Sequence, residues 1–310
     1  MAIEHASVEV ARKPWGIADL RPWSSIDASG DPVGELWFQR ADNAPVPALL
    51  LKLLFTSEPL SIQVHPDDEF ARSIGLPNGK TEAWYILSAT PEARVAVGLK
   101  RQLTLQELRA SIKDGSIADL VQWRPVSKGD IIFVPARTIH AIGAGIVLAE
   151  IQQRSDTTFR LFDYGRQREL HEDNAVAASD AGPIQTQPGS RRLTTARTAL
   201  VTSPHFVIER IDLLANSDWA LDADQETWIL VIEGRARVGL TNMTVGDAVF
   251  IEADRTGIEV GPDGMRGLVA YPGPDPVVAL LQDSGERMTK SAGTPALLSP
   301  KSIETVKAQT

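Results

Sequence analysis

The sequence of 310 residues contains no cysteine. Disulfides, thiolate metal sites and cysteine nucleophiles are therefore excluded, and a bound metal ion would need histidine, carboxylate or amide ligands. The chain also lacks a run of roughly 20 apolar residues, which a membrane helix needs. Its first residues, from Met1 to Gly16, contain no apolar core of the signal-peptide kind. We therefore expect a cytoplasmic protein with no membrane partner.

Histidine is scarce, and the formal net charge is −9. A multi-histidine site can draw on only five candidates, which are His5, His65, His140, His171 and His205. An acidic protein binds nucleic acid poorly, so no nucleic-acid partner is expected. The sequence shows no glycine-rich phosphate loop, nucleophile elbow or dinucleotide fingerprint. Side-chain cations would have to bind an anionic small molecule.

Short strands dominate the pattern, because segments rich in Val, Ile, Leu and aromatic residues alternate with Gly, Pro, Asn and Asp. This rhythm predicts an all-β fold with antiparallel strands in a sandwich or barrel. The strands are expected at 49–55, 84–87, 94–97, 130–134, 146–153, 157–163, 206–213, 227–233, 236–240 and 247–252. Helices are expected at 168–178 and at 105–121, where Thr104 is a candidate N-cap with Glu107 three residues on and Gly115 divides the segment in two.

Two short blocks of sequence occur twice. Residues 82–87 resemble 226–230, and residues 129–136 resemble 246–253. Their spacing predicts a duplicated β-domain with an insertion in the first copy. The alternative is a chance similarity between two strand-turn-strand sequences. Gly257 stands where the first copy has His140. We therefore expect the chemistry in the first copy alone.

The first copy contains a candidate metal site. Alternation along residues 61–65 places Ser61, Gln63 and His65 on one face of a strand, with apolar residues on the other. Glu82 opens an apolar strand, and His140 follows a turn and a strand. Two His, one Glu and one Gln suit Zn²⁺, whereas an iron oxygenase more typically has two His and a carboxylate. Each of these residues taken alone could instead be an ordinary hydrogen-bonded core residue.

Several longer strings resemble the type I mannose-6-phosphate isomerases in their shorter bacterial form. The matching strings are Leu60-Ser61-Ile62-Gln63-Val64-His65-Pro66-Asp67-Asp68, Gly79-Lys80-Thr81-Glu82, residues 150–160, Lys13-Pro14-Trp15-Gly16 and Arg168-Glu169-Leu170-His171. The resemblance covers about residues 10 to 175 strongly. It implies one zinc ion per chain, held by Gln63, His65, Glu82 and His140.

Residues 129–140 resemble the second cupin motif, with Arg137 where that motif usually has Gly. The longer isomerases have a His where this chain has Gly79, so a mechanism that needs that histidine does not transfer. The combined pattern predicts two cupin-like β-barrel or jelly-roll domains. We expect a catalytic metal-binding domain at 1–180 with a helical insertion at about 102–122, a linker at 181–194, a degenerate domain without a metal site at 195–285, and a tail at 286–310.

The resemblance also implies roles for five residues around the metal. Lys52 and Ser61 match residues that contact the substrate phosphate, although a Lys in an apolar run otherwise suggests a side chain that reaches solvent. Arg160 matches an active-site arginine that could support an enediolate. The carrier of the proton is left open among Glu150, Lys80 and metal-bound water. Glu150 could instead pair with Arg160, and Lys80 on sequence alone suggests a solvated loop residue.

Other polar residues of the first copy are given structural roles. Asp67, Asp68 and Glu69 are expected to form a solvated turn and a helix N-cap. His171 is expected inside the second helix, in a structural or surface position.

The predicted reaction is the reversible isomerisation of mannose 6-phosphate and fructose 6-phosphate through a zinc-stabilised cis-enediol, as the resemblance implies. The small-molecule partner would be a sugar phosphate. The alternatives are an isomerase of another sugar phosphate, a metal-dependent cupin oxygenase and a non-catalytic sugar-phosphate-binding cupin. The oligomeric state cannot be predicted from the sequence.

Overall fold

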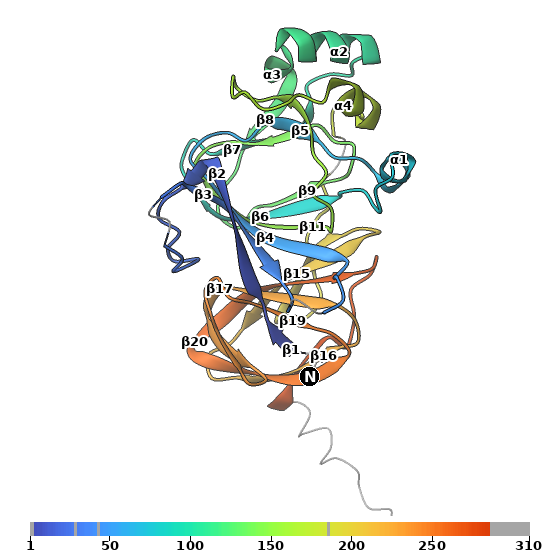
Figure 1. The fold of residues 1–310 in the computed structure, drawn as a ribbon. Helices are drawn as coiled ribbons and strands as arrows, with labels where there is room; N and C mark the ends of the chain where they lie inside the picture. The colour runs from blue at the N-terminus through green and yellow to red at the C-terminus, as the bar shows by residue number, and fades with distance from the viewer. Residues whose placement is uncertain (1–2, 28–29, 42–43, 185–186, 286–310) are drawn as a thin grey trace, which may run out of the picture.

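The computed structural model describes residues 3–27, 30–41, 44–184 and 187–285, so the predicted tail at 286–310 lies outside the described residues. Figure 1 shows two β units one above the other, with the helices gathered at the far end of the first unit. Antiparallel sheets of six, five and ten strands make up these units. The predicted all-β, cupin-like fold class is confirmed.

The first unit contains two sheets. The six-stranded sheet has the order β2 (Ser7–Ile17), β3 (Val33–Gln39), β4 (Leu49–Thr56), β11 (Ile146–Gln153), β6 (Glu82–Ala89) and β9 (Ile131–Val134). The five-stranded sheet has the order β12 (Phe159–Phe162), β5 (Ile62–Val64), β10 (His140–Ile142), β7 (Arg94–Leu99) and β8 (Val121–Pro125). Apolar side chains of both sheets share one core cluster, which includes Trp84, Ile86, Val95, Val97 and Ile142. This packing holds the sheets face to face.

The helices lie outside the sheets. The predicted capping box of Thr104 and Glu107 is confirmed at the start of α2 (Leu105–Asp114), and α3 (Ile117–Leu120) follows as a separate short helix. The predicted helix at 168–178 begins only at Glu172, as α4 (Glu172–Ala178). The backbone before it pairs elsewhere, because His171 N donates to Arg160 O at 2.9 Å. In the described part of the chain, no helix is long and apolar enough to cross a membrane.

The second unit is the ten-stranded sheet. Its main path runs β1 (Ile3–His5), β19 (Ala248–Ile251), β17 (Thr227–Val238), β20 (Asp254–Pro272), β15 (Phe206–Leu213), β14 (Arg197–Thr202) and β13 (Arg191–Arg192), with β16 (Asp218–Ala223), β18 (Thr241–Thr244) and β21 (Leu281–Asp283) beside it. The strands predicted at 227–233 and 236–240 are in fact one strand, β17. It continues through irregular pairing near Gly234, whose φ of +73° suits glycine.

The two units share strand order. The order β4, β11, β6, β9 in the first matches β15, β20, β17, β19 in the second, as a duplication would give. The units also share a core, because Phe38 and Leu53 belong to the same buried cluster as Phe206 and Trp228. Strand β1, near the N-terminus, pairs with β19 of the second unit. The predicted end of the first domain at residue 180 and start of the second at residue 195 stay predictions. Strand β1 does not fit this division, because it belongs to the sheet of the second unit.

Candidate metal centre

Three of the four predicted metal ligands converge in the first unit. His65 follows β5, Glu82 opens β6 and His140 opens β10, and each residue is 1% exposed. One ligand atom of each lies within 4.8 Å of the others. The Nε2 atoms of His65 and His140 lie 3.3 Å and 3.5 Å from the Glu82 carboxylate. The fold therefore joins residues that are far apart in the sequence into one cluster.

Hydrogen bonds fix the state of both imidazole rings. The Nδ1 atoms of His65 and His140 lie 2.8 Å from the carbonyl oxygens of Thr157 and Thr138. A carbonyl oxygen only accepts, so Nδ1 carries the hydrogen and Nε2 keeps its lone pair. Burial lowers the pKa of His65 to about 3 and also lowers the pKa of His140. Both rings are therefore neutral and present their lone pairs to the cluster.

The central carboxylate completes a set of donors that fits a divalent cation. Burial alone would raise the pKa of Glu82, but Lys80 and His65 outweigh it and hold this pKa well below its ordinary value. The buried Nε2 of His65 and Oε2 of Glu82 have no hydrogen-bond partner among the described residues. Lone pairs that converge without a proton between them suit a metal ion, and the Nδ1 bonds orient the rings as metal ligands require.

Gln63 lies in reach of the same cluster. Its Nε2 is 3.2 Å from His140 Nε2, and its Oε1 accepts a hydrogen bond from Ser61 Oγ at 3.0 Å. Amide oxygen and nitrogen exchange places when the group turns by half a rotation. That turn would bring Oε1 to the cluster and let Nε2 donate to Ser61. The geometry is compatible with the predicted fourth ligand, whose role stays a prediction.

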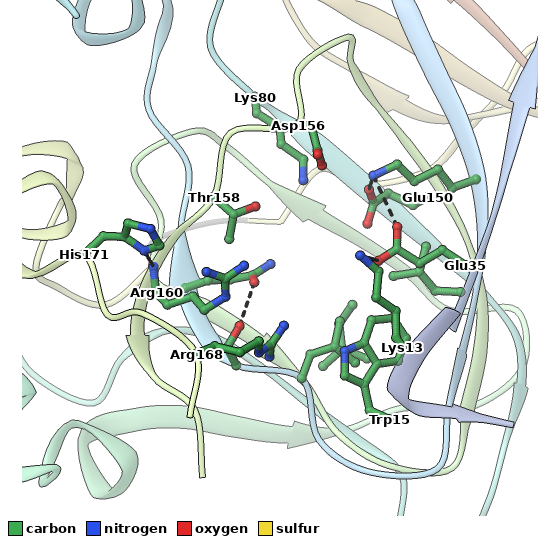
Figure 2. Close-up of a pocket in the computed structure, with 16 residues that line it drawn as sticks. Lys13, Trp15, Glu35, Lys80, Glu150, Asp156, Thr158, Arg160, Arg168 and His171 are labelled. Atoms are coloured by element: carbon green, nitrogen blue, oxygen red, sulfur yellow. Dashed lines mark hydrogen bonds and ion pairs between the residues drawn. The ribbon is translucent and has the colours of Figure 1, made fainter. Parts of the chain in front are cut away.

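A cavity of about 240 Å³ opens above Gln63. Figure 2 shows its charged groups on two walls, with Arg160, Arg168 and His171 on one side and Lys13, Glu35 and Glu150 on the other. The lining contains five cations, Lys13, Lys52, Lys80, Arg160 and Arg168, against three carboxylates, Glu35, Glu150 and Asp156. The pocket is thus locally positive although the chain as a whole is acidic.

Lys52 faces this pocket and does not reach solvent, since it is only 3% exposed. Its Nζ lies 3.3 Å from Glu150 Oε1 and 3.8 Å from Glu35 Oε2. The alternative of an ion pair between Glu150 and Arg160 is not seen among the described residues, where Glu150 instead pairs with Lys52 on the adjacent strand. Burial raises the pKa of Glu150, with Lys52 opposing that change.

The remaining predicted residues also lie around the pocket. Ser61 is buried, and Lys80 is 4% exposed with its Nζ 3.4 Å from Glu82 Oε2, so Lys80 is not a solvated loop residue. Burial would lower the pKa of Lys80, but Glu82 and Glu150 outweigh it and raise this pKa. The Nε of Arg160 is buried and has no hydrogen-bond partner in the described ranges, and burial lowers the pKa of its guanidinium.

Several lining residues were not predicted. Three of them, Lys13, Trp15 and Arg168, lie in sequence strings that resemble the family, but no role was predicted for them. Glu35 gave no signal, since only the pairing of β3 with β4 brings it near Lys52.

Two expectations near the pocket need correction. His171 lies at the N-terminal boundary of α4, lines the pocket, and accepts a hydrogen bond from Arg160 N through Nδ1 at 3.1 Å. Asp67 is the N-cap of α1 (Asp68–Ser73), as expected, and accepts from Phe70 N at 2.8 Å. Asp68 is the first residue of α1 and is only partly solvated, with its side chain 31% exposed. Its Oδ1 accepts from Gly79 N and from Gln153 Nε2.

Comparison with known proteins gives a consistent result, although no protein-family model matches. A mannose-6-phosphate isomerase of Streptococcus mutans is 34% identical over 225 residues, which are 68% of this chain and 71% of that protein. The crystal structure of the mannose 6-phosphate isomerase of Bacillus subtilis has a TM-score of 0.77 at 25% identity, over 87% of this chain and 100% of that one. A mannose 6-phosphate isomerase bound with zinc and yttrium shares the fold, with a TM-score of 0.67 at 16% identity over 88% of this chain and 100% of that one. This chain belongs to the mannose-6-phosphate isomerase family.

Proposed function

We propose that this protein interconverts mannose 6-phosphate and fructose 6-phosphate, with one Zn²⁺ per chain held by Gln63, His65, Glu82 and His140. The observation that carries the proposal is the convergence of three lone-pair donors next to a cation-lined cavity, whose lining residues Gln63 and Lys80 contact the cluster. Imidazole and carboxylate ligands suit zinc. One carboxylate on a divalent ion leaves a net charge of about +1, which favours an anionic sugar phosphate.

A divalent ion in this centre would supply Lewis-acid stabilisation of negative charge on neighbouring substrate oxygens. The protein must then remove the proton next to the substrate carbonyl and return it to the adjacent carbon. Glu150 suits this task, because burial raises its pKa towards the operating range of a general base. Lys80 has a raised pKa and keeps its proton, so it is better suited to donate a hydrogen bond to a substrate oxygen.

Substrate binding would use the cations of the pocket. Lys52 and Ser61 are proposed to hold the phosphate, and Arg160 to support the enediolate. Lys52 already contacts Glu35 and Glu150, so a bound phosphate would replace part of these contacts. The buried Nε of Arg160 offers a donor that no other described residue uses. The expected cytoplasmic location stays a prediction.

Metal analysis and a coupled isomerase assay on the same preparation test this proposal. We expect about one zinc per chain. Mannose 6-phosphate should be converted in the absence of O₂, and the hydrogen on C2 of the substrate should exchange with deuterium from the solvent in D₂O. His140→Ala should lose both metal and turnover, whereas His5→Ala, at an exposed position in β1, should keep both. Full turnover by metal-free protein would refute the mechanism. Faster turnover of another sugar phosphate would identify that compound as the substrate in place of mannose 6-phosphate.

A further inference from the structure

Lys80 lines the pocket but lies in a segment, residues 79–81, that is not part of a strand. Strand β6 begins only at Glu82, and the three residues before it are in irregular conformation. Lys80 is nonetheless buried, with its Nζ 3.4 Å from Glu82 Oε2. A buried lysine at a fixed distance from a carboxylate needs a backbone that is held in place. Contacts other than a sheet ladder must supply that restraint.

Lys80 N itself donates to Pro66 O at 2.9 Å. Further restraint comes from Asp68 and Gln153, which bind the residues on both sides of Lys80. Gly79 N donates to Asp68 Oδ1 at 2.8 Å, and Gln153 Nε2 donates to the same oxygen at 3.0 Å. Thr81 N donates to Gln153 Oε1 at 2.9 Å, and Gln153 N donates to Thr81 O at 3.0 Å. We call these four residues, Asp68, Gly79, Thr81 and Gln153, the clasp.

The clasp joins the segments that carry the site. Asp68 begins α1 shortly after His65, and Gln153 ends the strand that carries Glu150. The hydroxyl oxygen of Thr81 accepts from Ala136 N at 3.2 Å, on the segment that leads to His140. A shift of the clasp would therefore move Lys80 relative to groups on three different segments.

The space around Gly79 shows how closely this clasp is packed. A Cβ atom at Gly79 would lie 2.5 Å from Pro66 O and from the carbonyl carbon of Asp67, and 2.7 Å from Asp68 N. These are backbone atoms that cannot turn aside as a side chain can. Gly79 therefore leaves no room for the histidine that longer isomerases have at this position, unless the clasp opens.

We propose that Asp68 and Gln153 are positioning residues that set where Lys80 stands against Glu82 and the bound substrate. The inference rests on the proposed isomerase function and adds two residues that belong neither to the pocket lining nor to the cluster of candidate metal ligands. Misplacement of a reacting group by about 1 Å can cost on the order of 100-fold in rate. Loss of the clasp should therefore lower kcat while the metal remains bound.

Gln153→Glu tests the clasp in the metal-loaded enzyme. The new carboxylate cannot donate to Asp68 and repels it. We expect kcat to fall at least about tenfold, with metal content unchanged and KM within about twofold. Amide hydrogen exchange at residues 79–81 should become faster. The added Asp68→Asn substitution removes the repulsion and keeps an oxygen that can accept from Gly79 N, so it should recover part of kcat and of the protection.

Glu69→Gln is the matched control, because it changes charge by the same amount as Asp68→Asn at the exposed neighbouring position. It should change neither kcat nor exchange. Asp68→Ala is the second variant if Gln153→Glu does not fold, and it should give the same loss. Unchanged kcat and protection in Gln153→Glu would overturn the clasp, as would loss of metal together with activity. A wild-type protein without isomerase activity would instead refute the proposed function, whereas the exchange data would still report on the clasp.

Discussion

The two β units contain the same Glu-x-Trp pair and place it in different surroundings. Trp84 Nε1 donates to Glu82 Oε1 at 3.2 Å in the first unit, and Trp228 Nε1 donates to Glu226 Oε1 at 3.1 Å in the second. Glu82 faces two neutral imidazoles. Glu226 instead accepts from the backbone nitrogens of residues 48 and 49, at 2.5 Å and 2.9 Å, at the start of β4.

The comparison shows that the groups facing the carboxylate decide its use. In the first unit, converging lone pairs leave a position for a cation. In the second, backbone N–H groups satisfy the carboxylate, and it ties the second unit to the strand that carries Lys52. The same local sequence thus gives a candidate ligand in one copy and a structural hydrogen-bond acceptor in the other.

The largest contrast is expected between Glu82→Gln and Glu226→Gln. Glu82→Gln removes the only carboxylate of the centre, and we expect it to lose bound metal and at least about 1,000-fold in kcat/KM, since the metal supplies several kcal/mol of transition-state stabilisation. Glu226→Gln should keep the metal and most of the activity. Metal analysis and the coupled assay check both variants. Equal metal loss in both would mean that the second unit takes part in the centre.

A buried cation in each unit gives the second contrast. Arg197 holds Glu209 through two bonds of 2.7 Å and also donates to the carbonyl oxygens of residues 277 and 278. Lys52 has looser contacts at 3.3 Å and 3.8 Å and lines a cavity. The first arrangement gives its cation four short hydrogen bonds, whereas the second leaves capacity for a ligand.

Arg197→Met should therefore lower the free energy of unfolding by about 3–5 kcal/mol, because it leaves Glu209 buried without its cationic partner and with only the Tyr271 hydroxyl as a donor among the described residues. Lys52→Met should lower it less, since the contacts of Lys52 with Glu150 and Glu35 are longer, but should lower the activity more. Urea denaturation and the coupled assay separate these effects. The reverse ranking would show that Lys52 is the structural cation.

Much of the first unit could be predicted from sequence, because its signals are local. Alternating residues located β5, which contains Gln63 and ends just before His65, and the Thr104 capping box located α2. The ion pairs of Glu35 and Glu150 with Lys52 depend on which strands are neighbours in the sheet. A local sequence pattern does not predict the order of strands. The irregular backbone before α4 was missed for the same reason, because a bond between His171 and Arg160 holds it.

The pH dependence of stability gives a smaller contrast at Glu226. Burial raises its pKa above the ordinary 4.5, and hydrogen bonds from Ala48 and Leu49 oppose that change only in part. A carboxyl whose folded pKa is raised stabilises the fold below its unfolded pKa, and this contribution is lost as pH rises through the folded pKa. The advantage of wild type over Glu226→Gln should thus be largest near pH 4 and shrink towards neutrality. Urea denaturation across this range checks it, and a constant difference would contradict it.

The smallest expected effect concerns the helical insertion, which the second copy lacks. Thr104 and Glu107 form reciprocal bonds at the start of α2, with Thr104 N donating to Glu107 at 2.8 Å and Glu107 N donating to the Thr104 hydroxyl oxygen at 3.2 Å. Thr104→Ala should lower the free energy of unfolding by about 1 kcal/mol, the usual cost of losing such a cap. Metal content and kcat should not change, because the cap is exposed and distant in sequence from every candidate ligand. A fall in kcat measured alongside the denaturation curve would mean that the insertion, and not the shared β scaffold alone, shapes the pocket.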